Sequence, residues 1–465
     1  MSGLTAARAL LAAGNEVEII EYQDRIGGRV WSPELSRGGY TELGAGHFRS
    51  NMPNVLNYIS YYDLDLTVMN DGLPIYANVD KHTGDLFYGR ASDLTTLEKW
   101  KLHYNETNIT PTSLMNYYLH LNGLDTSRVL EESYPSEEEI EKFDGVMFDQ
   151  LMIQSGASEG LLQILVDHCG GILDASALTM LPDLAYHMGD QNVFRIHGGN
   201  HMLPQAMARE IEEIAQKNVI HTSKNVTNID HSNEDEMVKV TAVDRESGEE
   251  VVYEADEVIS TVSFQLFKEN DVTIYPDWSP SKRKMFENFE WGNSMKVVCQ
   301  TESPTWLNKN AHGWPMAGTG DRIWERVIDI TGASRHGNLF FYLNGDNSKT
   351  VAEMFPKEES GAHLKKRAEY VINEFNKDMP GLIEECIEPT SIYWDEVEWI
   401  KASFGEPPLG EAYWMIKEWE KPEGDRIWLS GDFTSMKTGW VEGAIEAGMR
   451  VAKAIDSNAK MVFEE

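Results

Sequence analysis

The sequence predicts an α/β protein in which a dinucleotide-binding domain is interleaved with an α+β domain that carries a helical cap. Three observations support this prediction. A small-residue helix at 2–14 leads into an apolar strand at 17–21. An apolar strand at 427–429 ends in a Gly-Asp turn, which opens a second small-residue helix from about residue 441. The length of 465 residues is too great for one simple core and suggests two domains.

The N-terminal segment is typical of the second half of a Rossmann βαβ unit. Gly14 supplies the C-cap of the helix, and Glu21 ends the strand about 20 residues after the helix start. An acidic side chain at that place accepts a hydrogen bond from a ribose hydroxyl. The first strand and the first two glycines of G-x-G-x-x-G are expected before Met1, which leaves Gly3 as the third glycine. We therefore expect a unit whose first strand is missing from this chain.

The C-terminal segment predicts a second contact with the same ligand. Asp432 follows Gly431 at the end of a strand, where its carboxylate can accept a hydrogen bond from a hydroxyl. The helix that starts near Val441 then offers backbone N–H groups to an anion or a polar ring. This arrangement indicates a nucleotide or flavin site. The alternative is an ordinary strand, turn and helix packed through small residues.

A series of glycine motifs carries a resemblance to a known family. Paired glycines beside a fixed cation let the backbone approach a pyrophosphate while the guanidinium binds its oxygens. The motifs run in the order Gly27-Gly28-Arg29, Glu42-Leu43-Gly44-Ala45, Gly198-Gly199-Asn200-His201-Met202-Leu203-Pro204, Ser430-Gly431-Asp432 and Gly439-Trp440-Val441-Glu442-Gly443-Ala444. Over nearly the whole chain they resemble the flavin-containing amine oxidases, which include monoamine, polyamine and L-amino-acid oxidases.

The resemblance implies transfer of hydride from an amine-bearing carbon to flavin N5, followed by reoxidation with dioxygen. It implies noncovalent FAD, because Ser403 stands where monoamine oxidases have the cysteine that bonds to flavin. The implied partners are dioxygen and a small-molecule amine or amino acid. No metal is implied, and the chain has no H-E-x-x-H, P-loop or G-x-S-x-G motif. The implied cofactor contacts are Gly3, Glu21, Gly27, Gly28, Arg29, Gly44, Ala45, Gly46, Val226, Trp399, Gly431, Asp432 and Val441.

Five residues are candidates for contact with the substrate. By the resemblance, Lys296 holds a water near flavin N5 and assists the reaction with oxygen; a solvent-facing strand lysine is the alternative. Phe404 and Trp440 fall on the positions of two rings that flank the amine, or else they pack in the core. Arg49 is the nearest cation for a substrate carboxylate, or else a surface or pyrophosphate-facing arginine. His47 faces the flavin edge or the substrate, or else it is structural.

The Gly-Trp pair at the aromatic wall resembles L-amino-acid oxidases, since Trp440 replaces the common tyrosine. We therefore expect an FAD-dependent oxidase of an L-amino acid or a primary amine, with an imine and hydrogen peroxide as products. The alternatives are a monoamine or polyamine oxidase without carboxylate recognition, and a flavin desaturase or dehydrogenase. A flavin-free binding or scaffold protein is the alternative outside enzymes.

The chain is predicted to leave the FAD-binding domain and to return to it twice. That domain comprises 1–75, 196–290 and 391–465, and the substrate domain comprises 76–195 and 291–390. The segment after 76 is amphipathic and helix-like, as at 160–166, and is expected to cap a substrate cavity. Strands are predicted at 218–222, 224–229, 237–243, 257–262, 294–300 and 338–343, and a helix at 361–379.

The composition limits the partners. The formal net charge of −36 argues against nucleic acid or an anionic membrane, because both would be repelled. A solvated acidic surface is the favoured interpretation of this charge, and attraction of cationic amines is the alternative. The acidic cluster between Glu131 and Glu141 is expected to form an exposed helix start.

The cysteines and the hydropathy pattern indicate a cytoplasmic protein. Cys169, Cys299 and Cys386 are widely spaced, so we expect reduced core residues and neither a disulfide framework nor a zinc site. No signal-like segment opens the chain, and no run of about 18 apolar residues occurs. Because the N-terminus looks incomplete, a leader sequence that this chain lacks remains an alternative. A homodimer remains an alternative as well.

Overall fold

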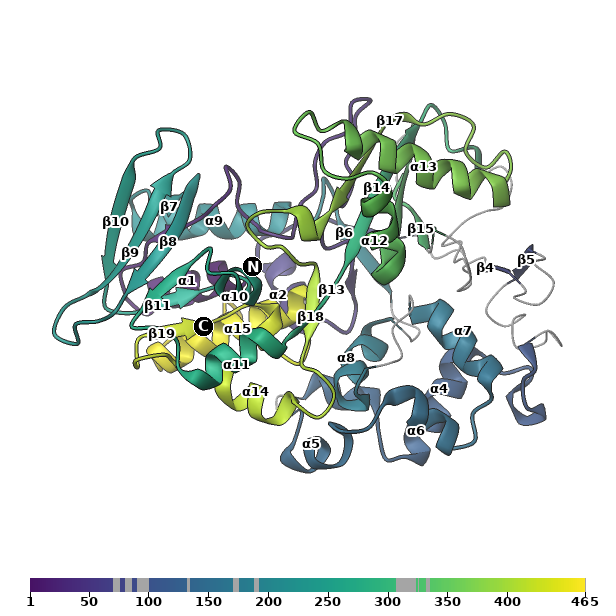
Figure 1. The fold of residues 1–465 in the computed structure, drawn as a ribbon, viewed down its shortest axis with the longest axis horizontal. Helices are drawn as coiled ribbons and strands as arrows, with labels where there is room; N and C mark the ends of the chain where they lie inside the picture. The colour runs from purple at the N-terminus through teal and green to yellow at the C-terminus, as the bar shows by residue number, and fades with distance from the viewer. Residues whose placement is uncertain are drawn as a thin grey trace.

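The computed structural model describes residues 1–69, 76–79, 86–89, 100–131, 134–169, 175–187, 192–306, 323–324, 326–331 and 335–464. It is a mixed helix and sheet fold, as the sequence predicts. Strands gather on two sides of the molecule, with helices between them and a further group of helices below (Figure 1). Within the described ranges, no helix is long and apolar enough to cross a bilayer.

The N-terminal helix packs against helices that are distant in the sequence. α1 (Ser2–Ala12) contacts α15 (Val441–Ile455) and α9 (Met202–Ala215). Small residues allow this close approach, because a Cβ atom on Gly448 would lie only 2.3 Å from the carbonyl oxygen of Ser2. Both predicted small-residue helices are confirmed.

Two short parallel strand pairs join the three stretches that the sequence assigns to the FAD-binding domain. β1 (Ile19–Ile20) pairs with β7 (Ile220–His221), and β11 (Val258–Ser260) pairs with β19 (Ile427–Leu429). Within the part of the chain that the structure describes, these pairs form separate sheets. The Rossmann-like unit without its first strand stays a prediction, as does the division into two domains.

A four-stranded sheet lies beside these pairs on the same side of the molecule (Figure 1). Its order is β10 (Glu250–Ala255), β9 (Val238–Asp244), β8 (Lys224–Asp230) and β12 (Thr273–Tyr275). Buried and less buried positions alternate along the first five residues of β9, as expected for a strand with one face on a core. The predicted strands at 224–229 and 237–243 are confirmed.

A second four-stranded sheet positions the substrate end of the site. Its order is β15 (Arg326–Asp329), β16 (Gly337–Asn344), β14 (Ser294–Thr301) and β17 (Ile387–Tyr393), and all neighbours are antiparallel. Met295 and Val297 share a core cluster with α13 (Ala362–Asp378), while Val298 packs in a separate cluster on the opposite face. Because side chains alternate along a strand, Lys296 points to the same face as Val298. The predicted strands and the helix at 361–379 are confirmed.

The cysteine prediction is wrong for two of the three residues. Cys299 and Cys386 form a disulfide, with their Cα atoms 5.4 Å apart. Cys299 lies in β14 and Cys386 directly precedes β17, and these antiparallel neighbours bring together two residues that are 87 positions apart. Spacing in the sequence does not reveal that pairing. The side chain of Cys169 lies outside the described residues.

The helical segment predicted after residue 76 is confirmed over its described part. It contains α4 (Pro111–Leu121), α5 (Glu137–Phe143), α6 (Phe148–Gln154), α7 (Glu159–Cys169) and α8 (Ala177–His187). Ser136 and Glu139 form a capping box at the start of α5, so the acidic cluster begins a helix as predicted. Figure 1 shows these helices as a group of their own beneath the second sheet.

Short elements connect these parts. β2 (Phe48–Arg49), β6 (Val193–Ile196) and β3 (Leu66–Val68) form a three-stranded sheet, β4 (Tyr76–Val79) pairs with β5 (Leu86–Gly89), and β13 (Glu290–Gly292) pairs with β18 (Phe404–Glu406). The further α-helices are α2 (Pro53–Tyr61), α10 (Phe264–Lys268), α11 (Pro280–Asn288), α12 (Gly345–Met354) and α14 (Ala412–Trp419). The 3₁₀ turns are η2 (Tyr104–Glu106), η3 (Thr126–Leu130), η5 (Trp394–Glu396) and η6 (Asp432–Thr434).

Candidate active site

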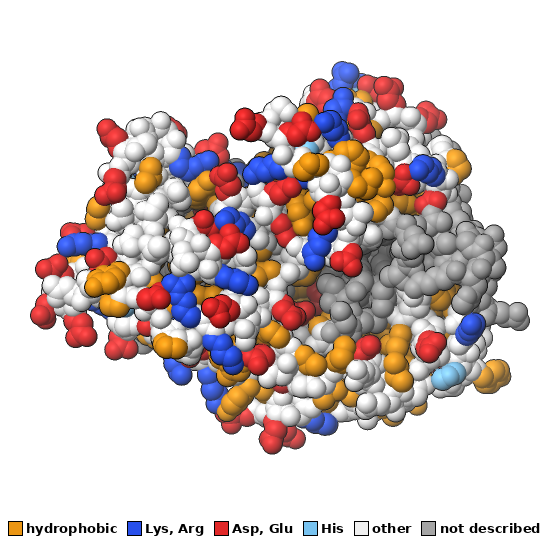
Figure 2. Space-filling model, in the orientation of Figure 1, with side chains coloured by type: hydrophobic (Ala, Val, Ile, Leu, Met, Phe, Trp, Pro, Cys, Tyr) orange, Lys and Arg blue, Asp and Glu red, His pale blue; other side chains and the backbone are white. Residues whose placement is uncertain are grey.

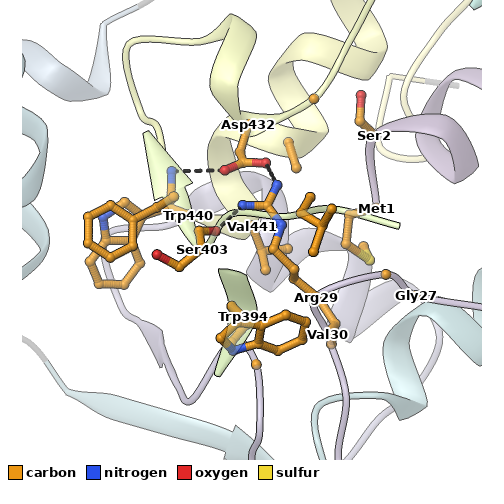
Figure 3. Close-up of a pocket in the computed structure, with 18 of the residues that line it drawn as sticks. Met1, Ser2, Gly27, Arg29, Val30, Trp394, Ser403, Asp432, Trp440 and Val441 are labelled. Carbon is orange, nitrogen blue, oxygen red and sulfur yellow. Dashed lines mark hydrogen bonds and ion pairs between the residues drawn. The ribbon is translucent and has the colours of Figure 1, made fainter. Parts of the chain in front are cut away.

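One cavity contains both predicted ends of the site. Its volume is about 350 Å³, whereas a single water needs only about 15 Å³. The walls come from the start of α1, the end of β1, the loops at 26–30 and 44–47, strands β14 and β16, and the turn before α15. Figure 3 shows Arg29 and Asp432 between Trp440 on one side and Met1 on the other.

Two helix N-termini open into this cavity. Ser2 and Gly3 in the first turn of α1, and Val441 at the start of α15, line it. Neither helix has a side-chain cap at its N-terminus. Backbone N–H groups in the first turn of a helix carry partial positive charge and need acceptors. This end of the cavity therefore suits an anion.

Arg29 places a cation at the same end. Its guanidinium donates to the Asp432 carboxylate and to the Ser403 carbonyl oxygen, and the N–H of Gly439 donates to Asp432 at 3.0 Å (Figure 3). Gly28 next to it has φ +58°, and an added Cβ would meet nothing within 4 Å. The backbone there is left-handed and open to the cavity, which explains the glycine.

Glu21 lines the cavity at the end of β1, as predicted. One of its carboxylate oxygens accepts a hydrogen bond from the backbone N–H of Gln23 at 2.9 Å. Burial raises the pKa of this carboxyl group above its usual value. The position suits an acceptor for ligand hydroxyls.

The loop at 44–46 forms part of the cavity wall. A Cβ on Gly44 would lie 1.6 Å from the carbonyl oxygen of Arg29, so only glycine fits. Ala45 donates from its N–H to that same oxygen at 3.0 Å, and its carbonyl accepts from the Asn200 side chain at 2.9 Å. The Gly-Gly-Asn motif therefore braces this loop from behind. Gly46 approaches the amine of Lys296, since an added Cβ would lie 3.5 Å from Nζ.

Lys296 reaches the cavity from β14 and is almost fully buried. Its Nζ donates to the carbonyl oxygens of Glu42, at 3.0 Å, and Gly44, and lies 4.4 Å from the centre of the Phe340 ring. Burial lowers the pKa of the Lys296 amine, and the negative charge of Glu42 opposes that shift. The alternative of a solvent-facing lysine is excluded.

Glu42 is a fully buried acid beside this lysine. Ser32 donates to its carboxylate at 2.7 Å, and the backbone N–H of Asn200 donates at 3.0 Å. Burial raises the pKa of Glu42, while these hydrogen bonds and Lys296 act in the opposite direction. The pair places a titratable amine at the cavity wall and a titratable acid beside it.

Aromatic rings surround the substrate end. Phe404, Trp440 and His47 line the cavity, and the rings of His47 and Trp440 meet edge to face with centroids 5.7 Å apart. Gly292 makes room for Phe404, because an added Cβ would lie 2.7 Å from its ring. Trp399 also lines the cavity and meets Trp394 edge to face at 6.0 Å.

The structure does not bring two of the predicted contact residues to this cavity. Arg49 is buried in β2 and is not among the lining residues. Val226 lies in β8, packs against the main hydrophobic core and does not line the cavity either. The other predicted site residues all lie on the cavity wall. Their roles stay predictions.

Sequence reasoning missed several lining residues of the substrate end. Asp183 in α8, together with Phe340 and Tyr342 in β16, forms part of the wall. Trp440 donates from its indole N–H to the Asp183 carboxylate at 3.1 Å. The signal for Asp183 is a single acid in the otherwise apolar stretch at 177–186. Phe340 and Tyr342 carry no such signal, because alternating aromatic residues are common in any strand.

The motifs correspond to a known family. The family model described as "Flavin containing amine oxidoreductase" matches residues 1–456. The chain belongs to this family. It is similar to the flavin-dependent L-tryptophan oxidase RebO of Lentzea aerocolonigenes, with 23% identity over 98% of this chain and 96% of that protein. It is also similar to putrescine oxidase of Kocuria rosea, with 22% identity over 98% of this chain and 93% of that protein.

A solved structure has the same fold. Putrescine oxidase bound to putrescine matches this amine oxidoreductase with a TM-score of 0.77 and 19% identity, over 98% of this chain and 97% of that chain. The family confirms the resemblance stated from the motifs and the expectation of a flavin cofactor.

The residues of the cavity fit FAD. Arg29 and two uncapped helix N-termini offer donors to a pyrophosphate, and Gly28 leaves room for its approach. Glu21 offers an acceptor to a ribose hydroxyl at the end of β1. Ser403 carries a hydroxyl that donates to the carbonyl of Gly292, and it has no thiol with which to bond a flavin.

Proposed function

We propose that this flavin-containing amine oxidoreductase is an FAD-dependent oxidase of a primary amine or an L-amino acid. The products are an imine, which water converts to a carbonyl compound and ammonia, and hydrogen peroxide. One observation carries the proposal: a single cavity contains an anion-binding end at Arg29 and an aromatic end at Trp440 and Lys296. A flavin with a substrate in front of it needs both ends in one space.

The chain's own residues orient the substrate and exclude water. When bound, FAD supplies the hydride acceptor and passes the electrons on to dioxygen. Phe404 and Trp440 hold the amine against their ring faces and aim its C–H bond. Ile328 and Phe340 supply an apolar wall, which favours the neutral amine needed for hydride loss.

Lys296 serves the reaction with oxygen in this proposal. Its amine lies at the wall of the cavity, held by the Glu42 and Gly44 carbonyl oxygens. Burial lowers the pKa of the Lys296 amine. In this proposal the amine therefore holds a water at the cavity wall and exchanges a proton with that water.

A primary amine without a carboxylate is the favoured substrate. Among the described residues that line the cavity, the arginine is Arg29, whose guanidinium is already bound to the Asp432 carboxylate. Arg49, the expected carboxylate partner, does not line the cavity. An L-amino acid is the second candidate, supported by Trp440 and by the similarity to an L-tryptophan oxidase.

The test is peroxide release by the purified protein after its flavin absorbance is recorded. The substrates are matched pairs, such as pentylamine with L-norleucine and phenethylamine with L-phenylalanine, which differ only in the carboxylate. Peroxide from the amines supports the favoured substrate, and peroxide from the amino acids alone supports the second candidate. Flavin reduction without peroxide would favour a dehydrogenase, and a protein that takes up no FAD would contradict the proposal.

A further inference from the structure

We propose that Glu42 is a positioning residue for Lys296, and that the negative charge of its buried carboxylate keeps a proton on the Lys296 amine at the cavity wall. This inference deepens the proposed function and rests on it for the reaction with oxygen that Lys296 serves. Glu42 itself does not line the cavity, so it acts on the reaction through Lys296.

The hydrogen bonds of the Glu42 carboxylate favour its ionised form. Oε2 accepts from the Ser32 hydroxyl at 2.7 Å, and Oε1 accepts from the backbone N–H of Asn200 at 3.0 Å. The Ser32 oxygen in turn accepts from the backbone N–H of His201 at 3.1 Å, so its own proton points to Glu42. A carboxylate whose two oxygens both accept hydrogen bonds is stabilised as an anion. Because the side chain is fully buried, that anion needs cations around it.

Two cations act on this carboxylate, and they differ in kind. Burial raises the pKa of Glu42, and Lys296 and Arg195 oppose that shift. Arg195 is buried in β6 and donates to the Ile330 carbonyl oxygen at 3.5 Å, and a guanidinium does not give up its proton in a protein. Tyr40, whose ring centre lies 5.9 Å from the Arg195 guanidinium, is a neutral phenol with a pKa that burial raises. Lys296 is therefore the cation whose charge can change.

The contacts of Lys296 show why its third proton matters. Nζ donates to the carbonyl oxygens of Glu42, at 3.0 Å, and Gly44. On the β16 side it lies 4.4 Å from the centre of the Phe340 ring and 5.4 Å from that of the titratable Tyr342. A neutral amine has two N–H donors, and the two carbonyl oxygens use both, whereas an ammonium has a third. Only the ammonium therefore retains an N–H that can donate into the cavity.

The reaction with oxygen needs such a cation. Over the whole proposed reaction the amine substrate gives up two electrons and two protons, and dioxygen takes up both to become hydrogen peroxide. Negative charge develops on the oxygen as the electrons arrive, and a fixed ammonium at the cavity wall stabilises that charge. Burial lowers the pKa of the Lys296 amine, and the charge of Glu42 opposes that shift. Without Glu42, the amine would lose its proton at a lower pH.

The experiment measures flavin reoxidation in the FAD-loaded protein by stopped-flow absorbance over a range of pH values. The flavin is first reduced by light without oxygen, so no amine substrate is needed. Glu42→Gln keeps the shape of the side chain and removes its charge. We expect the pH at which the reoxidation rate falls to half its maximum to be lower by at least about one pH unit in this variant. Above the wild-type midpoint the rate should then be about 10-fold lower, and it should recover at low pH.

Three further variants serve as controls. Glu42→Asp retains the charge and should retain the wild-type pH profile. Ser32→Ala removes one hydrogen bond from the carboxylate and should shift the profile in the same direction as Glu42→Gln by a smaller amount, which tests the inference even if Glu42→Gln does not fold. Glu141→Gln removes a negative charge from an exposed position on α5 and should leave the profile unchanged. An unshifted profile in both Glu42→Gln and Ser32→Ala would overturn the inference.

A double-mutant cycle distinguishes an action through Lys296 from general damage to the site. In a Lys296→Met background, Glu42→Gln should change the reoxidation rate by less than about twofold, because the proton that it controls is already absent. Effects of the two changes that simply multiply would overturn the inference.

Melting temperatures of the same four FAD-loaded proteins need no turnover. Because the buried acid and the buried amine compensate each other, the double variant should lose less than the sum of the two single losses. Additive losses would overturn the pairing of Glu42 with Lys296 even if amines are oxidised. Non-additive losses in a protein whose flavin no amine or amino acid reduces would support the pairing and contradict the proposed function.

Discussion

At the scale of single residues, the site depends on side chains that the fold holds in unusual surroundings. Lys296 is buried against two backbone carbonyl oxygens, and Glu42 is buried behind it with hydrogen bonds from Ser32 and Asn200. Such an amine exchanges its proton more readily than a surface lysine does, because burial disfavours its charged form. This is the residue on which the oxidase reaction with oxygen should depend most.

Replacement of Lys296 by methionine should therefore act on one half of the reaction. Met fills a similar volume and carries no proton, so we expect Lys296→Met to slow reoxidation of the flavin by dioxygen by about 100-fold. Anaerobic reduction of the flavin by an amine should change far less. Stopped-flow absorbance measures both steps, and Lys349→Met, at an exposed position of α12, is the matched control. Equal slowing of both steps would contradict this role.

The motifs predicted much of the site at this scale. The glycines predicted as cofactor contacts all line the cavity, because a close approach of the backbone to a ligand requires glycine and is therefore recognisable in the sequence. Arg49 is a candidate only as the nearest arginine after the Glu42–Ala45 motif, and the structure places it in β2, where it does not line the cavity. Asp183 is an isolated acid in an apolar helix, so only the fold reveals that it faces the cavity.

At the scale of elements, α15 secures the start of α2. The Glu442 carboxylate in α15 accepts hydrogen bonds from the backbone N–H groups of Asn54, at 3.1 Å, and Val55, at 3.0 Å, in the first turn of α2. Met52 at the N-cap of α2 supplies no side-chain cap, so Glu442 takes that role from a distant part of the chain. Burial raises the pKa of Glu442 to about 7.

This shift predicts a specific pH dependence of stability. An acid whose pKa is raised in the folded state binds its proton more tightly there, so its contribution is complete at low pH and declines as the pH rises from about 4.5 to about 7. Glu442→Gln cannot titrate. The melting temperature of the wild type should therefore fall relative to that of Glu442→Gln over this range, by the equivalent of roughly 3 kcal/mol.

Thermal melts of both proteins at several pH values measure the difference. Glu212→Gln, on the exposed side of α9, is the control and should follow the wild type at every pH. A difference between wild type and Glu442→Gln that stays constant, or that changes in the opposite direction, would contradict the raised pKa.

Elements with a strong local signal were predicted well. The helix at 361–379 corresponds to α13, and the strand at 294–300 corresponds to β14. The disulfide between Cys299 and Cys386 was not predicted, because it depends on the pairing of β14 with β17. The pairing of strands that are far apart in the chain depends on the whole fold, so the residues around each cysteine do not indicate it.

At the scale of the whole molecule, the dominant property is the net charge of −36. Acidic and basic side chains are spread over the visible face and do not form one large acidic patch (Figure 2). This distribution agrees with a solvated acidic surface. Its field nevertheless favours the approach of cations over anions.

The charge predicts a salt dependence for cationic substrates. Screening lengths shorten from about 30 Å at 0.01 M salt to about 8 Å at 0.15 M salt. We therefore expect kcat/KM to fall with rising ionic strength, more steeply for 1,5-diaminopentane than for pentylamine, while kcat stays constant. Steady-state kinetics in sodium chloride and in potassium chloride measure this effect. The same slope for both amines would contradict a long-range contribution.

The measurement that tests the central claim most directly is anaerobic mixing of the purified, FAD-loaded protein with amines, followed by admission of oxygen. The account predicts that flavin absorbance bleaches with a primary amine and returns with oxygen, with one hydrogen peroxide released for each cycle. A flavin that no amine or amino acid bleaches, or a chain that stays colourless with added FAD, would contradict the assignment of an FAD-dependent amine oxidase.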